Sequence, residues 1–416
     1  MAHGPGHSGQ HSPHGTPLAQ HPNAWGARAT SGPSGLGVGT TALRILYVSD
    51  SLMAGGIESQ LVELLTRLNP TRFHSRVLCL YGPHVRGLHF APRLRAAGIP
   101  VTTLDLGWSA QDKLRAIRRI IATVWASRPE IIQAEGYHAN LLTRLARPFL
   151  PPVQLIGTVR GMETTKQLLY ERLSHWCCAT LVASGTHLSS ALVHRAGIAA
   201  SKIHVIPNAI DTTRFAAPLD PTLRQRIAPG MRRVLVSMGR ISKQKRMHLI
   251  AQALGMLKEQ GRLPNDVRVM IVGPVEDQRM QAQLEAAVSH YELGGHLIQH
   301  HETDTPEDYL HACDASILFT TLEGISCAML ESLAAGRPVI ISEDANAARV
   351  VEHGVNGWAV PTNDVAALAD ALHAVFTLPT DALERMHGTC QTSASKFDIH
   401  PLVERYMALY EEIAGK

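Results

Sequence analysis

Short apolar runs alternate with longer amphipathic stretches from residue 43 almost to the end of the chain. Each run is typical of a buried strand, and the stretches between them carry apolar residues at helical spacing. The expected strands are Leu43–Val48, Arg76–Leu80, Val101–Leu104, Glu130–Ala134, Gln154–Val159, Leu181–Ser184, Ile203–Ile206, Arg233–Met238, Arg268–Val272, Leu297–Gln299, Ala315–Thr320, Val339–Ile341 and Trp358–Val360. This alternation predicts an α/β protein with parallel sheets, in which ligands bind at the carboxyl ends of the strands.

The amphipathic stretches predict helices, and the strands fall into two groups. The clearest helices are expected at Leu88–Ala97, Lys113–Trp125, Arg246–Gln260, Cys327–Ala335, Asp364–Leu378 with Asn363 as its cap, and Pro401–Ile413. Between the groups, residues 213–231 hold three prolines and a glycine, which is typical of an interdomain linker. We therefore expect one domain over residues 41–212 and a second over residues 232–396.

One strand–helix–strand unit, from Leu322 to Ile340, carries two carboxylates. Glu323 follows the strand in a tight turn with Gly324, Ser326 can cap the next helix with its hydroxyl, and Gly336 can end it. Glu331 lies further along the helix, and its side chain leans back toward the helix start. Both carboxylates can reach one ligand across the helix mouth. By spacing alone, a loop glutamate and a solvated helical glutamate explain the pair equally well.

Two further loops join a strand end to a helix start. Gly55 and Gly56 precede a helix near Ile57, where free backbone N–H groups can meet an anion. Gly239, Arg240 and Lys245 lie between a strand and a helix, where a guanidinium and an ammonium can hold phosphate oxygens. An ordinary turn and an ordinary basic loop are the alternatives. The G-x-G-x-x-G dinucleotide pattern is absent from the first loop, which argues against NAD.

The spacing of Glu323 and Glu331, with Gly324, Gly336 and Pro338, resembles the E-x7-E signature of retaining family 4 glycosyltransferases. Five other stretches are similar to that family. They are Gly55-Gly56-Ile57-Glu58, Pro207–Asp211, the loop from Gly239 to Lys245, Gly273-Pro274, and the turn from Gly354 to Gly357. The resemblance covers about residues 43–415. It implies the GT-B fold, two facing Rossmann-like doubly wound domains with a cleft between them, and a final helix 401–413 that packs back on the first domain.

The resemblance also implies roles for single residues. Glu323 would lie against the donor sugar, and Glu331 would bind the ribose of the nucleotide. Arg240 and Lys245 would stabilise the leaving diphosphate as catalytic cations, with His138 as a further catalytic candidate. The remaining nucleotide-sugar contacts would come from Gly55, Gly56, Gly239, Gly273, Gly324, Ile325 and Ser326.

This chain departs from the family pattern at several positions. Many members have histidines near the positions of Glu135 and Arg160, which are therefore candidates for the acceptor side of the site. His138 either substitutes for one of these histidines or serves the acceptor, and a structural role fits it nearly as well. Ala209 replaces a glycine, so a positive φ would be less easily adopted there.

Composition narrows the class of protein. The chain has 416 residues, of which 45% are hydrophobic and 18% charged, with a net charge of +4, and it lacks the dense basic runs of nucleic-acid-binding proteins. Its six cysteines show no C-x-x-C spacing, and no run of 18 apolar residues occurs, so we expect a cytoplasmic protein with reduced thiols. Residues 1–40 are rich in His, Gly, Pro and Ser, which predicts a disordered tail. Metal binding by its imidazoles is the alternative.

The stretch Lys113–Trp125 combines an apolar stripe, Leu114, Ile117, Ile121 and Val124, with three arginines elsewhere on the helix. Packing on the sheet is the ordinary explanation. Attachment to an anionic membrane surface is the alternative, and it would place the protein peripherally on the inner face of the membrane, near a lipid-linked acceptor.

The resemblance implies a reaction. A retaining transferase of this family would move a hexose-type sugar from a nucleotide diphosphate, with uridine the favoured base, to a hydroxyl of a sugar, glycan or lipid-linked acceptor. No metal, cofactor or nucleic acid is implied, because cationic side chains and helix N-termini stabilise the leaving group. Epimerisation of a sugar nucleotide and a non-catalytic GT-B binding protein are the alternatives.

Overall fold

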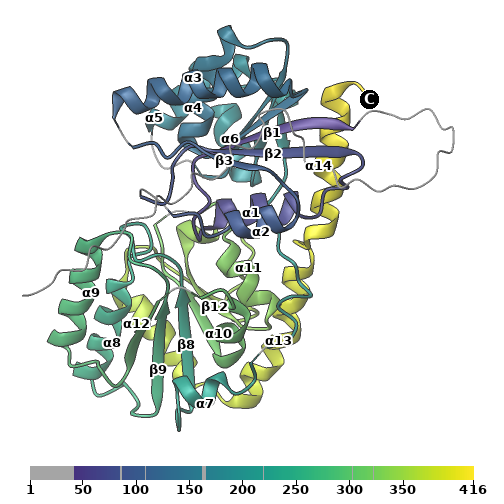
Figure 1. Cartoon of the computed structure of the whole chain (residues 1–416). Helices are drawn as coiled ribbons and strands as arrows, with labels where there is room; N and C mark the ends of the chain where they lie inside the picture. Colours follow the sequence, from purple (N-terminus) through teal and green to yellow (C-terminus); the bar gives the residue numbers. More distant parts are fainter. Residues whose placement is uncertain are drawn as a thin grey trace, which may run out of the picture.

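The computed structural model describes residues 42–84, 87–107, 109–161, 165–218, 220–301, 303–321 and 323–416. The predicted tail, residues 1–40, with its candidate metal-binding histidines, lies outside the described residues, and so does Leu322. Two parallel sheets, each with helices on both faces, form two domains joined along one side by the last helix (Figure 1). The predicted doubly wound α/β class is confirmed.

The first sheet has the strand order β3-β2-β1-β4-β5-β6-β7. Its strands are β1 (Leu43–Ser49), β2 (Phe73–Cys79), β3 (Val101–Thr103), β4 (Ile131–Glu135), β5 (Gln154–Val159), β6 (Thr180–Ala183) and β7 (Ile203–Val205). Strand β1 pairs in parallel with β2 (Leu43 opposite Phe73) and with β4 (Ile45 opposite Ile131). The order reverses between β1 and β4, which makes a crevice at the carboxyl ends of these two strands.

The second sheet has the order β10-β9-β8-β11-β12-β13, so its reversal lies between β8 and β11. Its strands are β8 (Arg233–Met238), β9 (Val267–Val272), β10 (Leu297–His300), β11 (Ala315–Leu318), β12 (Val339–Ser342) and β13 (Gly357–Val360). The loops after β1, β8 and β11 carry the glycines and charged residues that the sequence singled out. A ligand between the domains would therefore contact both reversal points.

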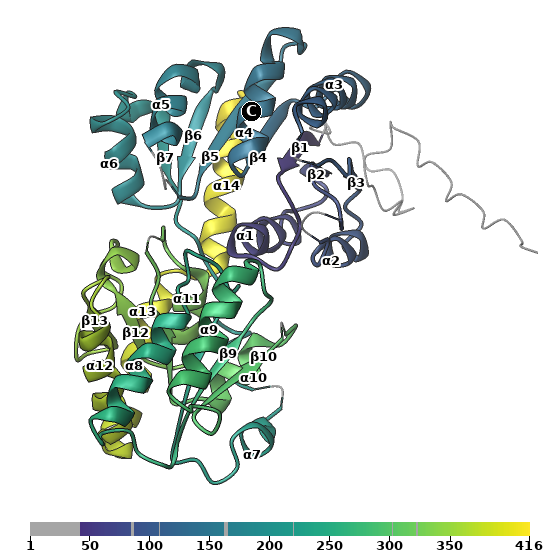
Figure 2. The same ribbon diagram turned by 90° about the vertical axis from the view of Figure 1, so that its left-hand side faces the viewer.

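Helices cover both faces of each sheet (Figures 1 and 2). In the first domain they are α1 (Gly56–Leu65), α2 (Ala91–Ala96), α3 (Ala110–Ser127), α4 (Tyr137–Ala146), α5 (Thr165–Ser174) and α6 (Thr186–His194). In the second they are α7 (Leu223–Ile227), α8 (His248–Glu259), α9 (Gln278–His290), α10 (Pro306–Ala312), α11 (Cys327–Ala334), α12 (Val365–Thr377) and α13 (Thr380–Ser395). The last helix is α14 (Ile399–Ala414).

Side chains alternate along the central strands between two hydrophobic cores. On β1, Leu43, Ile45 and Tyr47 pack with α1, α2 and α14, whereas Leu46 and Val48 pack with α3, α4 and α6. Successive side chains of a strand point to opposite faces, so a strand covered on both faces is apolar at every position. This is why the sequence shows continuous apolar runs rather than polar–apolar alternation.

Helix α14 leaves the second domain and packs on the first (Figures 1 and 2). The Tyr47 hydroxyl donates to the Tyr410 hydroxyl at 3.1 Å, and Tyr410 donates to Gln133 Oε1 at 2.7 Å. Lys416 Nζ lies 2.9 Å from Glu130 Oε1 at the end of the helix. Helix α14 therefore ties the two domains together through buried tyrosines of the first core.

Several local predictions need correction. On α3 the buried residues are Ala116, Ile120, Val124 and Ser127. Of the predicted stripe, Ile117 and Ile121 pack partly buried on the same core, whereas Leu114 is 50% exposed, because the helix is rotated so that Ala116 and Ile120 contact the sheet. The cap of α12 is Asp364, whose carboxylate accepts from the Ala367 N–H, and not Asn363.

Two other helices also differ from the prediction. Helix α13 was missed because its last turns are rich in Thr and Ser, which have weak helix propensity. Helix α2 starts at Ala91, three residues later than predicted, with Pro92 in its first turn. Among the described helices, none has both the length and the apolar character needed to cross a bilayer.

Candidate functional site

A cavity of about 750 Å³ lies between the two domains, at the carboxyl ends of their central strands. It brings together residues from loops that are far apart in the sequence. Twelve of the predicted site residues line it: Gly55, Gly56, Arg160, Gly239, Arg240, Lys245, Gly273, Gly324, Ile325, Ser326, Glu323 and Glu331. Glu135 and His138, the other two, are not among the lining residues. The size suits a ligand larger than a single sugar ring.

Glycines shape the floor of this cavity. Gly273, after β9, has φ +153°, and a Cβ there would lie 2.0 Å from the carbonyl oxygen of Gly239. Gly324 has no room either, because a Cβ would lie 2.6 Å from the Arg160 carbonyl oxygen of the other domain. The backbones therefore approach each other more closely than any other residue would allow.

The cations of the β8 loop are held by carboxylates. Lys245 Nζ lies 2.5 Å from Glu323 Oε1, and the Arg240 guanidinium pairs with Glu276. Each of these four side chains keeps part of its surface exposed. An incoming anion can therefore compete for the cations without entering a closed core. Glu276 had no motif to mark it, because it meets Arg240 only through the loop after β9.

Helix α11 begins at this cavity with Ser326, Cys327 and Ala328 on its wall. Ser326 is the N-cap residue by position, but its side chain makes no capping hydrogen bond, so the predicted hydroxyl cap is wrong. The first backbone N–H groups of a helix have no intrahelical acceptor, and they carry the positive end of the helix dipole. The mouth of α11 thus offers N–H donors to an anion.

Glu331 lines the cavity one to two turns inside α11. Loss of hydration raises its pKa to about 7. The nearby carboxylates of Glu307 and Glu63 also raise this pKa, whereas the Arg214 guanidinium lowers it. Arg214 also lines the cavity and pairs with Glu307 at 2.9 Å. No motif marks Arg214 in the sequence, because it comes from the segment that joins the domains and belongs to no periodic pattern.

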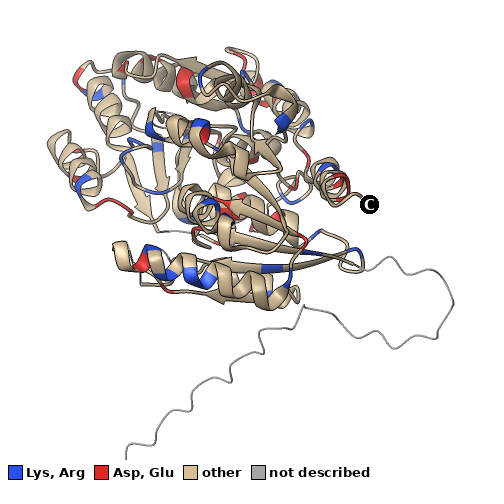
Figure 3. Cartoon of the chain, turned by 90° about the horizontal axis from the view of Figure 1, so that it is seen from above, with Lys and Arg blue, Asp and Glu red and all other residues tan. Residues whose placement is uncertain are grey.

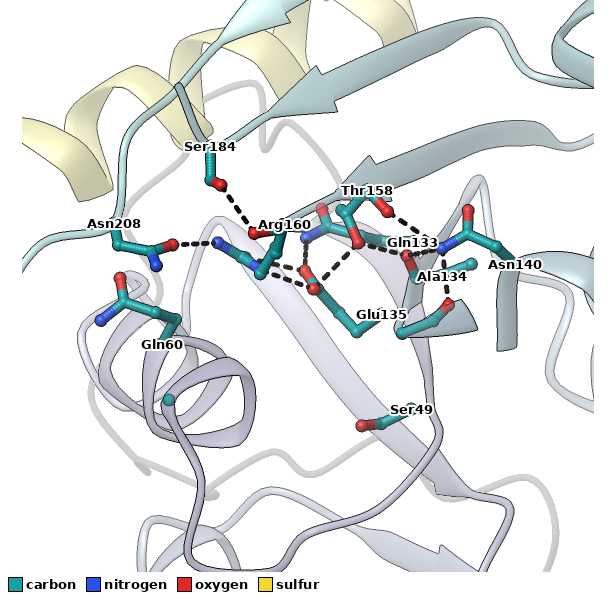
Figure 4. A network of polar contacts seen from close by, with 12 residues as sticks. Ser49, Gln60, Gln133, Ala134, Glu135, Asn140, Thr158, Arg160, Ser184 and Asn208 are labelled. Carbon is teal, nitrogen blue, oxygen red and sulfur yellow. Dashed lines mark hydrogen bonds and ion pairs between the residues drawn. The ribbon is translucent and has the colours of Figure 1, made fainter. Parts of the chain in front are cut away.

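Glu135 and Arg160 form a buried ion pair in the first domain (Figure 4). The Arg160 Nε and Nη2 atoms donate to the two Glu135 oxygens at 2.8 and 3.0 Å, and Thr158 and Gln133 donate to the same carboxylate. Glu135 is completely buried. Its carboxylate is therefore occupied in holding Arg160, and it does not face the cavity where an acceptor would lie.

The pair continues across the domain boundary through Asn208 (Figure 4). Arg160 Nη1 donates to Asn208 Oδ1 at 3.0 Å, and Asn208 Nδ2 donates to the Ile325 carbonyl oxygen of the other domain at 2.7 Å. The Gln60 side-chain amide accepts from the Ala209 N–H and donates to the Ala209 carbonyl oxygen. Its nitrogen also lies 3.4 Å from Cys327 Sγ. These contacts fix the loop that carries Glu323. Ala209 has no positive φ, so its departure from glycine causes no strain.

His138 lies at the start of α4, at the edge of the first domain that faces the cleft. Its ring packs edge-on against Tyr81 and Tyr137, and its Nδ1 lies 3.8 Å from Asp50 Oδ2. Asp50, directly after β1, also accepts from the His138 and Ala139 backbone N–H groups. The structure thus places His138 beside the cleft but outside the cavity wall.

Two family models match the two domains in turn. Glycosyltransferase Family 4 matches residues 54–214, and Glycosyl transferases group 1 matches residues 221–388. The chain belongs to glycosyltransferase family 4. The family recognised from Glu323, Glu331 and the glycine loops is thereby confirmed.

Curated relatives of this family 4 protein include glycosyltransferases named for colanic acid and amylovoran biosynthesis and for diphosphoundecaprenol and phosphatidyl-myo-inositol substrates. UDP-Gal:alpha-D-GlcNAc-diphosphoundecaprenol alpha-1,3-galactosyltransferase of Escherichia coli is 25% identical over 88% of this chain and 96% of its own length. WcaL of Salmonella typhimurium, named as a colanic acid biosynthesis glycosyltransferase, is 32% identical over 45% of each chain. The chain thus spans about half the length of some relatives that it matches.

Solved structures share the fold. HepE of Anabaena in complex with UDP-glucose superposes with a TM-score of 0.76 at 20% identity, over 89% of this chain and 100% of that one. Sucrose-phosphate synthase of Thermosynechococcus elongatus gives a TM-score of 0.74 at 14% identity, over 89% and 99%. The predicted GT-B arrangement of this family 4 protein is confirmed.

Proposed function

We propose that this family 4 protein transfers a sugar from a UDP-sugar to a hydroxyl of a glycan or lipid-linked acceptor, with retention of the anomeric configuration. The observation that carries the proposal is the joint presence, in one cavity, of Arg240, Lys245 and the mouth of α11 beside Glu323 and Glu331. Cations and helix N–H groups suit a diphosphate, and the carboxylates suit the hydroxyls of a sugar and a ribose.

The donor would lie with its diphosphate between the β8 loop and α11. Arg240 and Lys245 would exchange their contacts with Glu276 and Glu323 for phosphate oxygens, which frees Glu323 to accept from the hydroxyls of the donor sugar. Glu331 would accept from the ribose hydroxyls. Uridine is supported by the bound UDP-glucose of HepE and by the name of the E. coli galactosyltransferase.

Departure of the diphosphate would be the charge-forming step. The bond between the anomeric carbon and the phosphate oxygen breaks, and negative charge grows on that oxygen. This charge would be stabilised by Arg240, Lys245 and the α11 N–H groups, which are already in position before the bond breaks. Catalysis through these groups therefore requires no metal ion. Removal of Lys245 would therefore weaken both binding of the donor and the chemical step.

Retention is best explained by attack on the face that the diphosphate leaves. The acceptor oxygen would bond to the anomeric carbon while its proton passes to the departing phosphate oxygen. A double displacement would need a carboxylate on the opposite side of the sugar. Among the described lining residues of the first domain there is no carboxylate, and Glu135 is buried against Arg160. We assign His138 and Arg160 to the acceptor side, with His138 at the rim.

Ligand-dependent thermal unfolding tests the proposal. A ligand that binds only the folded protein raises its unfolding temperature by mass action. We expect one UDP-sugar to protect the wild-type protein equally with and without EDTA, and Arg240→Ala to lose this protection. Arg279→Ala, at an exposed arginine on α9, is the matched control and should behave as wild type. Product analysis by NMR would then give the anomeric configuration.

Three outcomes would contradict parts of the proposal. Absence of protection by every nucleotide sugar would favour a non-catalytic binding protein. Release of an altered sugar nucleotide without an acceptor would favour epimerisation. A product of inverted configuration would refute the same-face route.

A further inference from the structure

Exposed apolar side chains gather on one layer of helices in the first domain. Ten large hydrophobic side chains are exposed among the described residues, and two of them, Ile57 and Val355, lie elsewhere. The other eight belong to α3, α4, α5 and the short helical turns 147–149 and 175–177. They are Leu114, Trp125, Tyr137, Leu145, Phe149, Leu169, Leu173 and Trp176, and we call them the apolar layer.

Helices α3, α4 and α5 cover one face of the first sheet (Figure 2). The side chains of the apolar layer are exposed to solvent on these helices and the turns that follow α4 and α5. Trp125 Nε1 donates to the Phe149 carbonyl oxygen at 3.0 Å, which joins α3 to the turn after α4. The Tyr137 ring lies 5.9 Å from the Tyr170 ring, which joins α4 to α5. These contacts hold the three helices next to one another.

The most exposed part of the layer is a stripe along α5. Leu169, Leu173 and Trp176 follow one another at helical spacing and are 54%, 65% and 69% exposed. Single exposed apolar residues are normal on protein surfaces, but a stripe of large ones beside further aromatic residues marks a binding surface.

Among the described residues of the same helices and turns, the exposed charged side chains are all basic. Seven basic side chains are exposed: Lys113, Arg115, Arg118, Arg119, Arg128, Lys166 and Arg172. Among the described residues from 109 to 177, no acidic side chain is exposed. Asp112 bonds to Ser109, Glu171 is buried with Arg144 at 2.9 Å, and Glu130 pairs with Lys416. Blue segments accordingly predominate along α3, at the lower edge of Figure 3.

We propose that the apolar layer docks on an anionic lipid bilayer. Leu and Trp side chains would enter the boundary between headgroups and acyl chains, and the Lys and Arg side chains would pair with lipid phosphates. A surface for a protein partner would gain specificity from charges of both signs, whereas exposed acids are absent from the described part of this layer. The bilayer is therefore the occupant that the surface fits best.

The position of the layer relates docking to the proposed transfer. Tyr137 belongs to the layer, and its ring lies 5.2 Å from that of His138, at the edge of the cleft that we assign to the acceptor. Docking would hold this edge close to the headgroups, where the hydroxyl of a lipid-linked glycan would lie. This step rests on the proposed function, whereas the docking itself rests on the surface alone.

Vesicle cosedimentation of the full chain tests the docking. The probes are vesicles of phosphatidylcholine alone and vesicles that also contain phosphatidylglycerol. We expect the wild type to bind the second kind, more weakly as salt rises. Leu173→Ser/Trp176→Ser should lower the partition coefficient about tenfold, and Arg118→Gln/Arg119→Gln about fivefold per charge.

Matched controls come from the second domain. Val355→Ser changes an exposed apolar residue, and Arg279→Gln/Lys396→Gln removes two exposed charges, and both should bind vesicles as wild type does. Equal binding to both kinds of vesicle, or unchanged binding by Leu173→Ser/Trp176→Ser, would overturn the proposal. Light scattering that shows a dimer for the wild type and a monomer for Leu173→Ser/Trp176→Ser would also overturn the proposal. The apolar layer would then be an interface with a second copy of the chain.

The same variants separate this proposal from the proposed function. Thermal protection of Leu173→Ser/Trp176→Ser by a UDP-sugar should equal that of the wild type, because neither residue lines the cavity. Vesicle binding without protection by any nucleotide sugar would keep the docking surface and refute the transferase. Protection by a UDP-sugar without vesicle binding would keep the transferase and refute the docking surface.

Discussion

Replacement of Glu331 by glutamine should stabilise the ligand-free protein at high pH. The carboxyl has a pKa of about 7 in the folded protein against 4.5 for the ordinary group, because it loses hydration beside Glu307 and Glu63. An acidic group whose pKa is raised by folding does not lower the free energy of unfolding at a pH below its pKa in the unfolded chain. The cost grows as pH rises from 4.5 and is complete above about 7.

The size of the effect follows from the two pKa values. Ionisation of Glu331 costs the folded state about 1 kcal/mol at pH 5 and about 3 kcal/mol at pH 8. Glutamine has nearly the same shape and no charge at either pH. The gain in unfolding free energy from Glu331→Gln should therefore be about 2 to 3 kcal/mol larger at pH 8 than at pH 5. Effects that do not depend on pH cancel in this difference.

Urea unfolding of both proteins at pH 5, 6, 7 and 8, without ligand, measures this difference. Glu352→Gln, at an exposed glutamate of the same domain, controls for removal of a surface carboxylate. Protection by the UDP-sugar should fall in Glu331→Gln, because the amide is a weaker acceptor for ribose hydroxyls. A gain of equal size at pH 5 and pH 8 would refute the reasoning, because it would show that burial does not disfavour the Glu331 charge.

Three further changes have clear expected outcomes. Lys245→Met should weaken UDP-sugar binding about 10- to 100-fold, measured by calorimetry, through loss of a charge-assisted contact; unchanged affinity would place the diphosphate elsewhere. Asn208→Ala should lower the unfolding free energy by about 1–3 kcal/mol, because the Ile325 carbonyl loses its donor, and kcat should fall more than the KM for the donor rises. Gly273→Ala should destabilise by more than about 3 kcal/mol, whereas Gly388→Ala, with open space around its Cβ, should be neutral or stabilising in urea unfolding; equal effects would show that the Gly239 backbone yields.

Much of the site was predictable because it lies where regular elements end. Gly239, Arg240 and Lys245 follow an apolar run, and Glu323 follows another, so the rule that ligands bind at the carboxyl ends of parallel strands was enough to group them. The role of each residue still came from the resemblance to a family, since spacing alone left Glu323 and Glu331 as ordinary glutamates. Those roles remain predictions until variants are measured.

The contacts that the sequence did not reveal all cross between elements. Glu135 looked like an acceptor-side residue at a strand end, but its carboxylate is buried against Arg160, and only the fold places Thr158 and Gln133 around it. Arg214 and Glu276 were missed for the same reason. A pairing between residues from different loops leaves no periodic trace in either loop.

Short-range patterns in the amino-acid sequence determined the class of fold. The apolar runs, the glycines after them and the helical stripes are short-range patterns, and each follows from burial or backbone conformation at its own position. Tertiary structure decided which side of each helix faces water. Helix α3 turned Leu114 outward and Ala116 inward, because its fit against the sheet outweighs the hydrophobicity of one side chain. It also decided the charge of Glu331, since the loss of hydration depends on walls that both domains supply.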